Sequence, residues 1–188
     1  AFWGALFTVM SFLTTAGFES AEWDSAQIWS GLGTPGIILM GLAIMGGGVA
    51  TTAGGVKLMR VFALYLNGLQ EMQQLVHPSA VSGMGAVARR IGRQGAYHAW
   101  IFFMLFAMTL AALMLLLSLF GQEFEAATVL AVSALTTTGP LLEHGSETVI
   151  RLGDLGPEAK LVFAFGMIVG RLELLAFIAL LNPDLWRG

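Results

Sequence analysis

Long apolar runs separated by short polar or glycine-rich interruptions make up most of this chain. The longest run covers residues 96–120 and has aromatic side chains near its start, as the interfacial belt of a membrane-spanning helix does. A second run, residues 161–181, is interrupted only by Arg171 and Glu173. The pattern predicts two transmembrane helices, over residues 96–120 and 157–181.

Two other apolar runs, residues 1–13 and 124–135, are too short to cross a bilayer. At a rise of about 1.5 Å per residue each covers roughly 20 Å, whereas the hydrocarbon core is about 30 Å thick. Each run ends at a tract of threonine and glycine, "TTAGF" at 14–18 and "TTTGP" at 136–140, whose composition disfavours a continuing helix. We therefore expect two buried or re-entrant short helices, each followed by an irregular segment.

Residues 35–66 predict one helix that is broken in its middle. The segment starts as "PGIILMGLAIM", is interrupted by "GGGVATTAGG" at 46–55, and resumes as "VKLMRVFALYL". Unwound segments of this kind often line ion sites in transport proteins. The alternative is that the small residues only allow close packing between helices.

The chain repeats one plan at a constant offset of 122 positions (133 minus 11). The repeated unit is a short helix, a threonine-glycine tract, a polar linker and a longer helix opened by proline. The helix at 96–120 precedes the second unit, and its counterpart before the first is missing, so we expect the chain to be part of a longer polypeptide. The matching pairs are Ser11 and Ser133, Leu13 and Leu135, Thr14 and Thr136, Thr15 and Thr137, Gly17 and Gly139, Pro35 and Pro157, Met45 and Met167, and Gly48 and Gly170.

Composition places the chain in a membrane and leaves little room for catalysis. Of its 188 residues, 56% are hydrophobic and 11% charged, against about a quarter charged in ordinary soluble domains. The absence of cysteine rules out disulfides and thiolate metal sites. His77, His98 and His144 show no ligand spacing, and no catalytic triad or carboxylate pair stands out. We expect no enzyme activity, no cofactor and no nucleic-acid partner.

Charge orients the chain in the bilayer. Residues 57–95 carry five Lys and Arg residues against Glu71 alone, while the linkers behind the two tracts are acidic. By the positive-inside rule, residues 57–95 and the C-terminus are cytoplasmic and the tracts open to the outside. The stretch "SAVSGMGAVARRIGR" within this segment suits an amphipathic helix on anionic lipid.

The two tracts have the composition of an ion-binding lining. Irregular backbone at membrane depth occurs only where it is buried in protein or lines a water-filled path, and inward carbonyls of an extended tract can replace the hydration shell of a cation. Glycine in each tract would allow backbone angles closed to other residues. The alternative is that each tract merely caps or kinks a packed helix. The candidate ligands are Thr14, Thr15, Ala16, Gly17 and Phe18, and Thr136, Thr137, Thr138, Gly139 and Pro140.

A second candidate group would control passage below the tracts. Arg171, near the middle of a predicted span, should face a cavity or a partner, either as a fixed positive charge beside the ion path or as a buried structural tie. The remaining members lie in the glycine-rich interruption: Gly46, Gly47, Gly48, Thr51, Thr52, Gly54 and Gly55.

Four motifs in this order, "FLTTAGFES", "GGGVATTAGGVKLMRV", "SALTTTGP" and "GRLELLAFIALLNPDLWR", resemble the carboxyl-terminal part of Trk/Ktr/HKT potassium transporters, most closely the bacterial TrkH branch. The resemblance implies an all-α membrane protein built from repeated helix, re-entrant pore helix, filter loop and helix units around a potassium-channel-like pore. Residues 1–66 would then be the pore helix, filter and broken second helix of the third repeat. Residues 67–95 would be a cytoplasmic linker with an amphipathic helix, and residues 96–188 the complete fourth repeat.

The same resemblance implies roles for the candidate groups. The tracts 14–18 and 136–140 would be two of four filter strands, residues 46–55 an intramembrane gate, and Arg171 a pore-facing arginine. The implied partners are the bilayer of the inner membrane, the upstream repeats, a second copy in a homodimer, and a cytoplasmic nucleotide-binding subunit of the TrkA type.

We thus expect channel-like conduction of potassium, with potassium bound only by the filter and no other metal. Two alternatives stay open. One is a secondary transporter of a larger solute that binds at a broken helix, and the other is a non-conducting membrane interaction module.

Overall fold

The computed structural model of the chain describes residues 2–31, 35–48, 51, 53–76, 86–146 and 149–172, and within these ranges it is helical without strands. This confirms the predicted all-α fold. The helices are α1 (Phe2–Leu13), α2 (Trp23–Ser30), α3 (Pro35–Met45), α4 (Leu58–Val76), α5 (Ala86–Leu119), α6 (Phe124–Thr136), α7 (Leu141–His144) and α8 (Pro157–Arg171), with a 3-10 turn at Leu152–Asp154.

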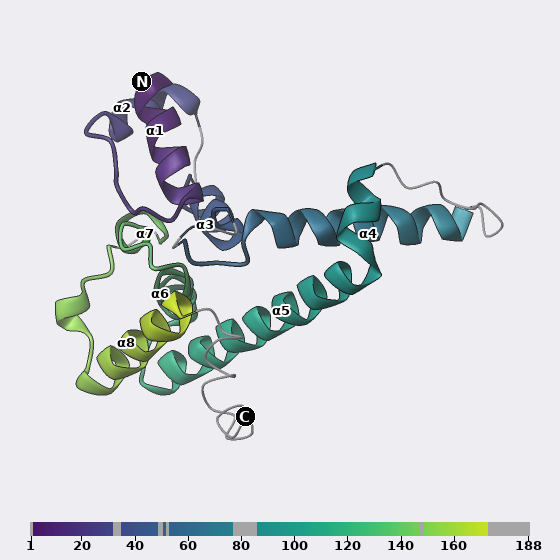
Figure 1. Cartoon of the computed structure of the whole chain (residues 1–188). Coiled ribbons are helices and arrows are strands. Elements are labelled where there is room, and N and C mark those ends of the chain that lie inside the picture. The colour runs from purple at the N-terminus through teal and green to yellow at the C-terminus, as the bar shows by residue number, and fades with distance from the viewer. Residues whose placement is uncertain are drawn as a thin grey trace.

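Helix α5 is the longest element and runs diagonally from α4 toward α8 (Figure 1). Its segment Gly95–Leu119 is the one stretch of the described residues that is long and apolar enough to cross a membrane. The helix begins at Ala86, ten residues before the predicted start at 96, so it extends into the predicted linker 67–95. Hydropathy marks where apolar residues begin, whereas the Ala- and Arg-rich sequence before residue 96 keeps the helix going without being apolar.

The interrupted helix divides into α3 and α4. Helix α3 ends at Met45 and α4 begins at Leu58, on either side of the glycine-rich segment. Helix α4 runs to Val76, ten residues beyond the predicted end at 66, because residues 67–76 contain helix formers and no proline. At the other end of the chain, the predicted helix 157–181 is seen as far as Arg171, and its last part lies outside the described residues.

Helix α6 is the centre of the fold. Nine of its residues are buried, among them every residue from Val129 to Thr136, so this part of the helix is enclosed on all sides. It packs against α3, α5, α7 and α8. Its equivalent in the first repeat, α1, packs against α2 and α3 and exposes large apolar side chains, with Trp3 76% accessible. The second tract is therefore held by a buried helix and the first by a peripheral one.

Candidate functional site

Both threonine-glycine tracts begin with the same helix cap. In the first, the Thr15 amide donates to the carbonyl of Phe12 (3.1 Å) and the Ala16 amide to that of Ser11 (2.9 Å). These two bonds form a Schellman motif, whose first non-helical residue adopts the left-handed conformation. Thr15 does so with φ = +53°.

The second tract repeats this cap in register. The Thr137 amide donates to Ala134 (3.2 Å), the Thr138 amide donates to Ser133 (3.1 Å), and Thr137 has φ = +56°. Glycine is usual at such a position, and a β-branched residue there is an outlier that costs about 1–3 kcal/mol. The sequence repeat is thus also a repeat of backbone geometry, strain included.

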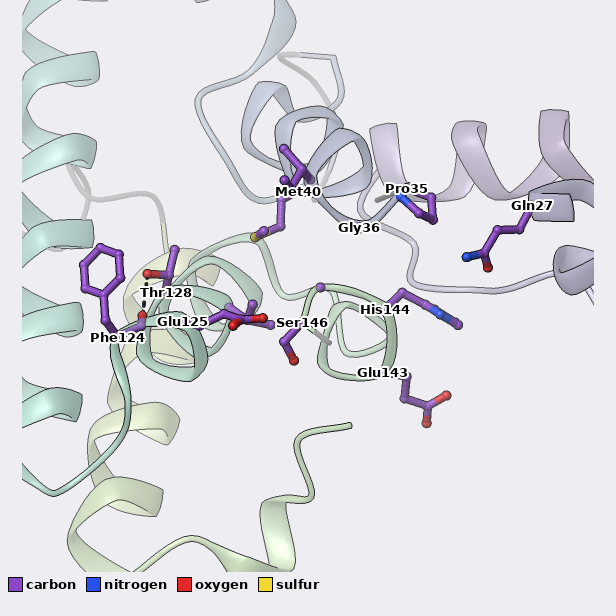
Figure 2. Close-up of a pocket in the computed structure, with 13 residues that line it drawn as sticks. Gln27, Pro35, Gly36, Met40, Phe124, Glu125, Thr128, Glu143, His144 and Ser146 are labelled. Atoms are coloured by element: carbon purple, nitrogen blue, oxygen red, sulfur yellow. Dashed lines mark hydrogen bonds between the residues drawn. The ribbon is translucent and has the colours of Figure 1, made fainter. Parts of the chain in front are cut away.

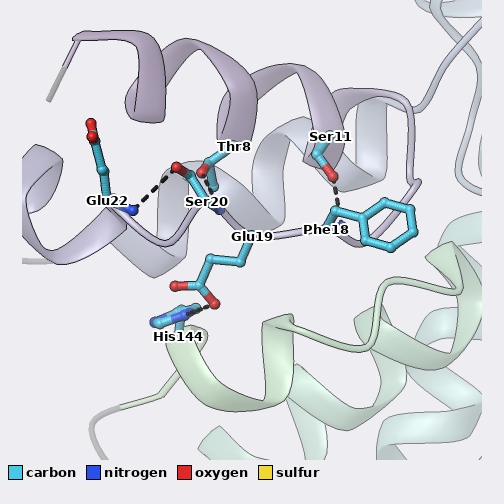
Figure 3. Close-up of polar contacts among 7 residues, drawn as sticks. All are labelled: Thr8, Ser11, Phe18, Glu19, Ser20, Glu22 and His144. Atoms are coloured by element: carbon cyan, nitrogen blue, oxygen red, sulfur yellow. Dashed lines mark hydrogen bonds and ion pairs between the residues drawn. The ribbon is translucent and has the colours of Figure 1, made fainter.

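A buried serine braces each tract from behind. The Ser11 hydroxyl accepts a hydrogen bond of 2.7 Å from the Phe18 amide (Figure 3), and the Ser133 hydroxyl donates one of 2.9 Å to the Thr138 carbonyl. The internal repeat in the sequence paired Ser11 with Ser133, but no role was predicted for either serine. Their matched positions one turn before each tract were the signal that could have identified them.

The structure places the two tracts next to each other. A Cβ on Gly17 would lie 3.4 Å from Cδ of Pro140 and 3.8 Å from the amide nitrogen of Gly139. Gly17 has φ = +72°, as predicted, but Gly139 does not adopt a positive φ and has open space where a Cβ would stand. The expectation that each glycine allows backbone angles closed to other residues fits Gly17, whereas Gly139 does not lie in the left-handed region.

Beyond the caps the two tracts differ. Residues 16–20 form neither helix nor strand, and none of the backbone hydrogen bonds in the described part of the chain ends on the carbonyls of residues 14–18. The second tract instead coils into α7. Pro140, with φ = −60° and ψ = −15°, opens this short helix, so the expectation of an extended tract is wrong for this segment. The carbonyls of Thr138, Gly139 and Pro140 accept the amides of Leu141, Leu142 and Glu143.

The glycine-rich segment folds back on the end of α3. The Val56 amide donates to Ile44 (2.9 Å) and the Leu58 amide to Gly47 (3.1 Å). Gly46 turns the chain with φ = +68°, and a Cβ there would lie 2.4 Å from a carbonyl oxygen of the same loop. Of the predicted gate residues, Thr52 lies outside the described residues.

This loop contacts both tracts. The Gly54 amide donates a buried hydrogen bond of 3.0 Å to the Thr15 hydroxyl. A Cβ on Gly54 would lie 2.7 Å from the Thr136 carbonyl oxygen. The structure thus brings the predicted gate against the first residues of each predicted filter strand.

The basic residues around the loop are placed differently from one another. Arg171 is the last residue of α8 and is exposed in this chain. Lys57, which the charge pattern assigned to the cytoplasmic segment, is 4% accessible and lies at the end of the loop with φ = +72°. It lines a small cavity together with Gly55 and Gly170. Hydropathy could not reveal the burial of Lys57, because a lysine that follows a run of glycines is typical of the end of a membrane-spanning segment.

Acidic and histidine side chains meet just after the two tracts. Nε2 of His144 lies 2.8 Å from Oε2 of Glu19 (Figure 3), and the ligand atoms of Glu19, Glu143 and His144 all lie within 4.8 Å of one another. The sequence did not predict this cluster, because its members come from two repeats. Glu143 and His144 also line an open groove between α3 and α6 that contains no residue of either tract (Figure 2).

Comparison with known proteins gives one consistent result. Residues 1–184 match the family model TrkH, described as a cation transport protein. The chain is 33% identical to the Trk system potassium uptake protein TrkH of Vibrio parahaemolyticus, covering 100% of the chain and 37% of that protein. It is 32% identical to the protein of the same description from Escherichia coli, over 97% of the chain and 36% of the relative.

A solved structure agrees with these sequence matches. The crystal structure of the potassium transporter TrkH from Vibrio parahaemolyticus superposes with a TM-score of 0.78 at 31% identity, covering 98% of this chain and 38% of that one. The chain therefore spans a little over a third of the length of the relatives it matches.

Proposed function

This chain belongs to the TrkH family of cation transport proteins, and we propose that it carries part of a pore that conducts potassium ions through the inner membrane. The observation that carries the proposal is the pair of capped threonine-glycine tracts lying side by side at the ends of α1 and α6. The relatives are named potassium uptake proteins, which agrees with potassium as the transported ion. The alternatives of a secondary transporter and of a non-conducting module have no such observation in their favour.

In this proposal the two tracts are two of four filter strands. The first tract offers carbonyls that no described backbone amide occupies, as a cation ligand requires. In the second tract the carbonyls of Thr138, Gly139 and Pro140 accept amides of α7, and the Thr136 carbonyl accepts the Thr138 hydroxyl at 3.3 Å. The Thr137 carbonyl would therefore be the first of this tract to contribute. Both short helices also point their partially negative C-terminal ends at this point, which favours a cation there.

The glycine-rich loop is the gate in this proposal. It lies in contact with both tracts, and Gly46 and Gly55 give it left-handed turning points. Arg171 directly follows Gly170, which lines the small cavity beside the loop, and is proposed as a charge that limits occupancy of the path.

The wider assembly is proposed from family membership. We infer a multi-pass protein of the inner membrane, with residues 57–95 and the C-terminus in the cytoplasm and the tract mouths outside. The upstream repeats would complete the ring, a second copy would form a homodimer, and a TrkA-type nucleotide-binding subunit would dock on the cytoplasmic side.

Selectivity of the complete protein in proteoliposomes tests the filter. We expect rubidium and potassium uptake without a co-solute, and we expect Gly139→Ser to weaken discrimination against sodium. Gly139 has open space at its Cβ position and does not require a positive φ, so the serine fits without disturbing the fold. Gly153→Ser is the matched control, because this glycine also has open space but lies in the outer linker.

Two results would contradict the proposal. An obligatory organic solute would favour the secondary transporter. Equal potassium-to-sodium ratios in the wild type and in Gly139→Ser, with flux intact, would remove the second tract from the filter.

A further inference from the structure

One hydrogen bond joins the glycine-rich loop to the first tract. It runs from the Gly54 amide to the Thr15 hydroxyl, measures 3.0 Å, is buried, and connects residues that are 39 positions apart. Thr15 is itself 7% accessible. The bond therefore links the candidate gate to the candidate filter through the Thr15 side chain, although the two segments are distant along the chain.

The position of the Thr15 hydroxyl is fixed by the helix cap. Its backbone is held in the left-handed region by the two bonds of the Schellman motif, so the side chain has little freedom to turn away from the loop. Strained residues persist where the surrounding structure over-determines them, and the two cap bonds do this at both Thr15 and Thr137. The bond to Gly54 is an additional contact at Thr15.

Gly54 also fits closely against the second tract. A Cβ on this residue would lie 2.7 Å from the Thr136 carbonyl oxygen and 2.8 Å from that of Leu135. These are backbone atoms of a buried helix end, and they cannot move aside as a flexible side chain can. Gly54 is thus the point at which the loop contacts both repeats at once.

We propose that the Thr15 hydroxyl is a latch that holds the glycine-rich loop closed against the two tracts, so that the loop opens only when this hydrogen bond breaks. The proposal rests on the proposed role of residues 46–55 as the gate. Thr15 is in this respect a positioning residue for the loop, separate from any carbonyl it offers to an ion.

The physical reason is the cost of an unsatisfied buried amide. Without the hydroxyl, the Gly54 amide in the closed loop loses its acceptor, while in an open loop it reaches water. Thr15→Val removes the hydroxyl and keeps the branched shape, so it shifts the loop toward opening. Thr15→Ser keeps the hydroxyl and is expected to hold the loop closed as the wild type does.

Hydrogen exchange of the complete protein in lipid nanodiscs measures the loop directly. We expect Thr15→Val to speed exchange of the peptide that contains Gly54 by about two- to tenfold, the range expected for one hydrogen bond. Thr137→Val is the matched control. Thr137 has the same cap and the same left-handed conformation, and the described part of the chain shows no hydrogen bond from its hydroxyl to the loop. This variant should leave the exchange of the loop at the wild-type rate.

Rubidium flux through the complete protein gives the second readout. Thr15→Val is expected to raise flux by a factor similar to the rise in exchange, while Thr15→Ser, which keeps the bond to Gly54, is expected to keep loop exchange at the wild-type rate. Equal loop exchange in the wild type and in Thr15→Val would overturn the latch. An equal rise of loop exchange in Thr137→Val would also overturn the latch, because the faster exchange would then come from a change in either helix cap and not from the Thr15 hydroxyl.

The two proposals can fail separately. A complete wild-type protein that passes no rubidium would overturn the conducting function. The comparison of exchange between Thr15→Val and Thr137→Val would still decide whether the hydroxyl holds the loop.

Discussion

Thr15 and Thr137 occupy matched positions of the two repeats and share the same strained backbone conformation. Each stands where a helix usually ends in glycine, and each adopts φ above +50°. The glycines two residues later differ from each other, since Gly17 has a left-handed backbone and Gly139 does not. Sequence identity between the two copies therefore predicts the cap correctly and the residues after it incorrectly.

Gly17 and Gly139 should differ in their tolerance of alanine. Gly17→Ala forces a Cβ into a left-handed residue and is expected to cost about 1–2 kcal/mol. Gly139→Ala meets neither a positive φ nor a neighbouring atom and should stay within about 0.5 kcal/mol of the wild type. Thermal unfolding of the complete protein in detergent would measure both, and equal losses would contradict the difference in conformation.

Among the elements, α3 and α8 start from matched prolines and end differently. Helix α3 ends at Met45, whereas α8 continues past the matching Met167 to Arg171. The residues that follow explain the difference, because glycines succeed Met45 while Ile168 and Val169 succeed Met167. The same register position therefore holds a loop glycine in one repeat and a helix glycine in the other.

Gly170 should be intolerant of substitution although it lies inside a helix. A Cβ there would lie 2.3 Å from the Leu135 carbonyl oxygen, so Gly170→Ala separates α8 from α6 and is expected to cost about 1–3 kcal/mol. Gly41→Ala is the control, since this glycine of α3 has no atom within 4 Å of its Cβ position and alanine favours the helix. A melting temperature lowered equally by both changes would show that the contact is unimportant.

The sequence predicted the elements whose signal is local. Apolar runs and glycine clusters located the short helices, the interruption before α4 and the repeat register. The lengths of α4 and α5 were not predictable from hydropathy, because a helix continues through polar residues once its backbone bonds are favourable. The contact of Gly54 with Thr15 was also hidden, because it joins residues 39 positions apart.

At the scale of the whole molecule, the charge pattern sets a testable orientation. The chain contains no cysteine, so a single introduced cysteine reports its own side of the membrane against a clean background in this region. Gln73 in α4 and Asp154 in the linker before α8 are both exposed.

We expect Gln73→Cys to react with a membrane-impermeant maleimide only from the cytoplasmic side, and Asp154→Cys only from the outside. Labelling of the complete protein in intact cells and in inverted vesicles distinguishes the two sides, with the parent protein as the control for cysteines elsewhere. The reverse pattern would invert the topology and put the tract mouths in the cytoplasm.

The length of α5 has a structural consequence for the whole molecule. Its 34 residues extend over about 50 Å, while the hydrocarbon core is only about 30 Å thick. Roughly 20 Å of a continuous rod thus projects beyond the lipid tails, and its other end packs through Phe106 and Leu113 into the core around α6. Helix α5 also packs against α4, so one continuous helix connects α4 with the helices that hold the second tract.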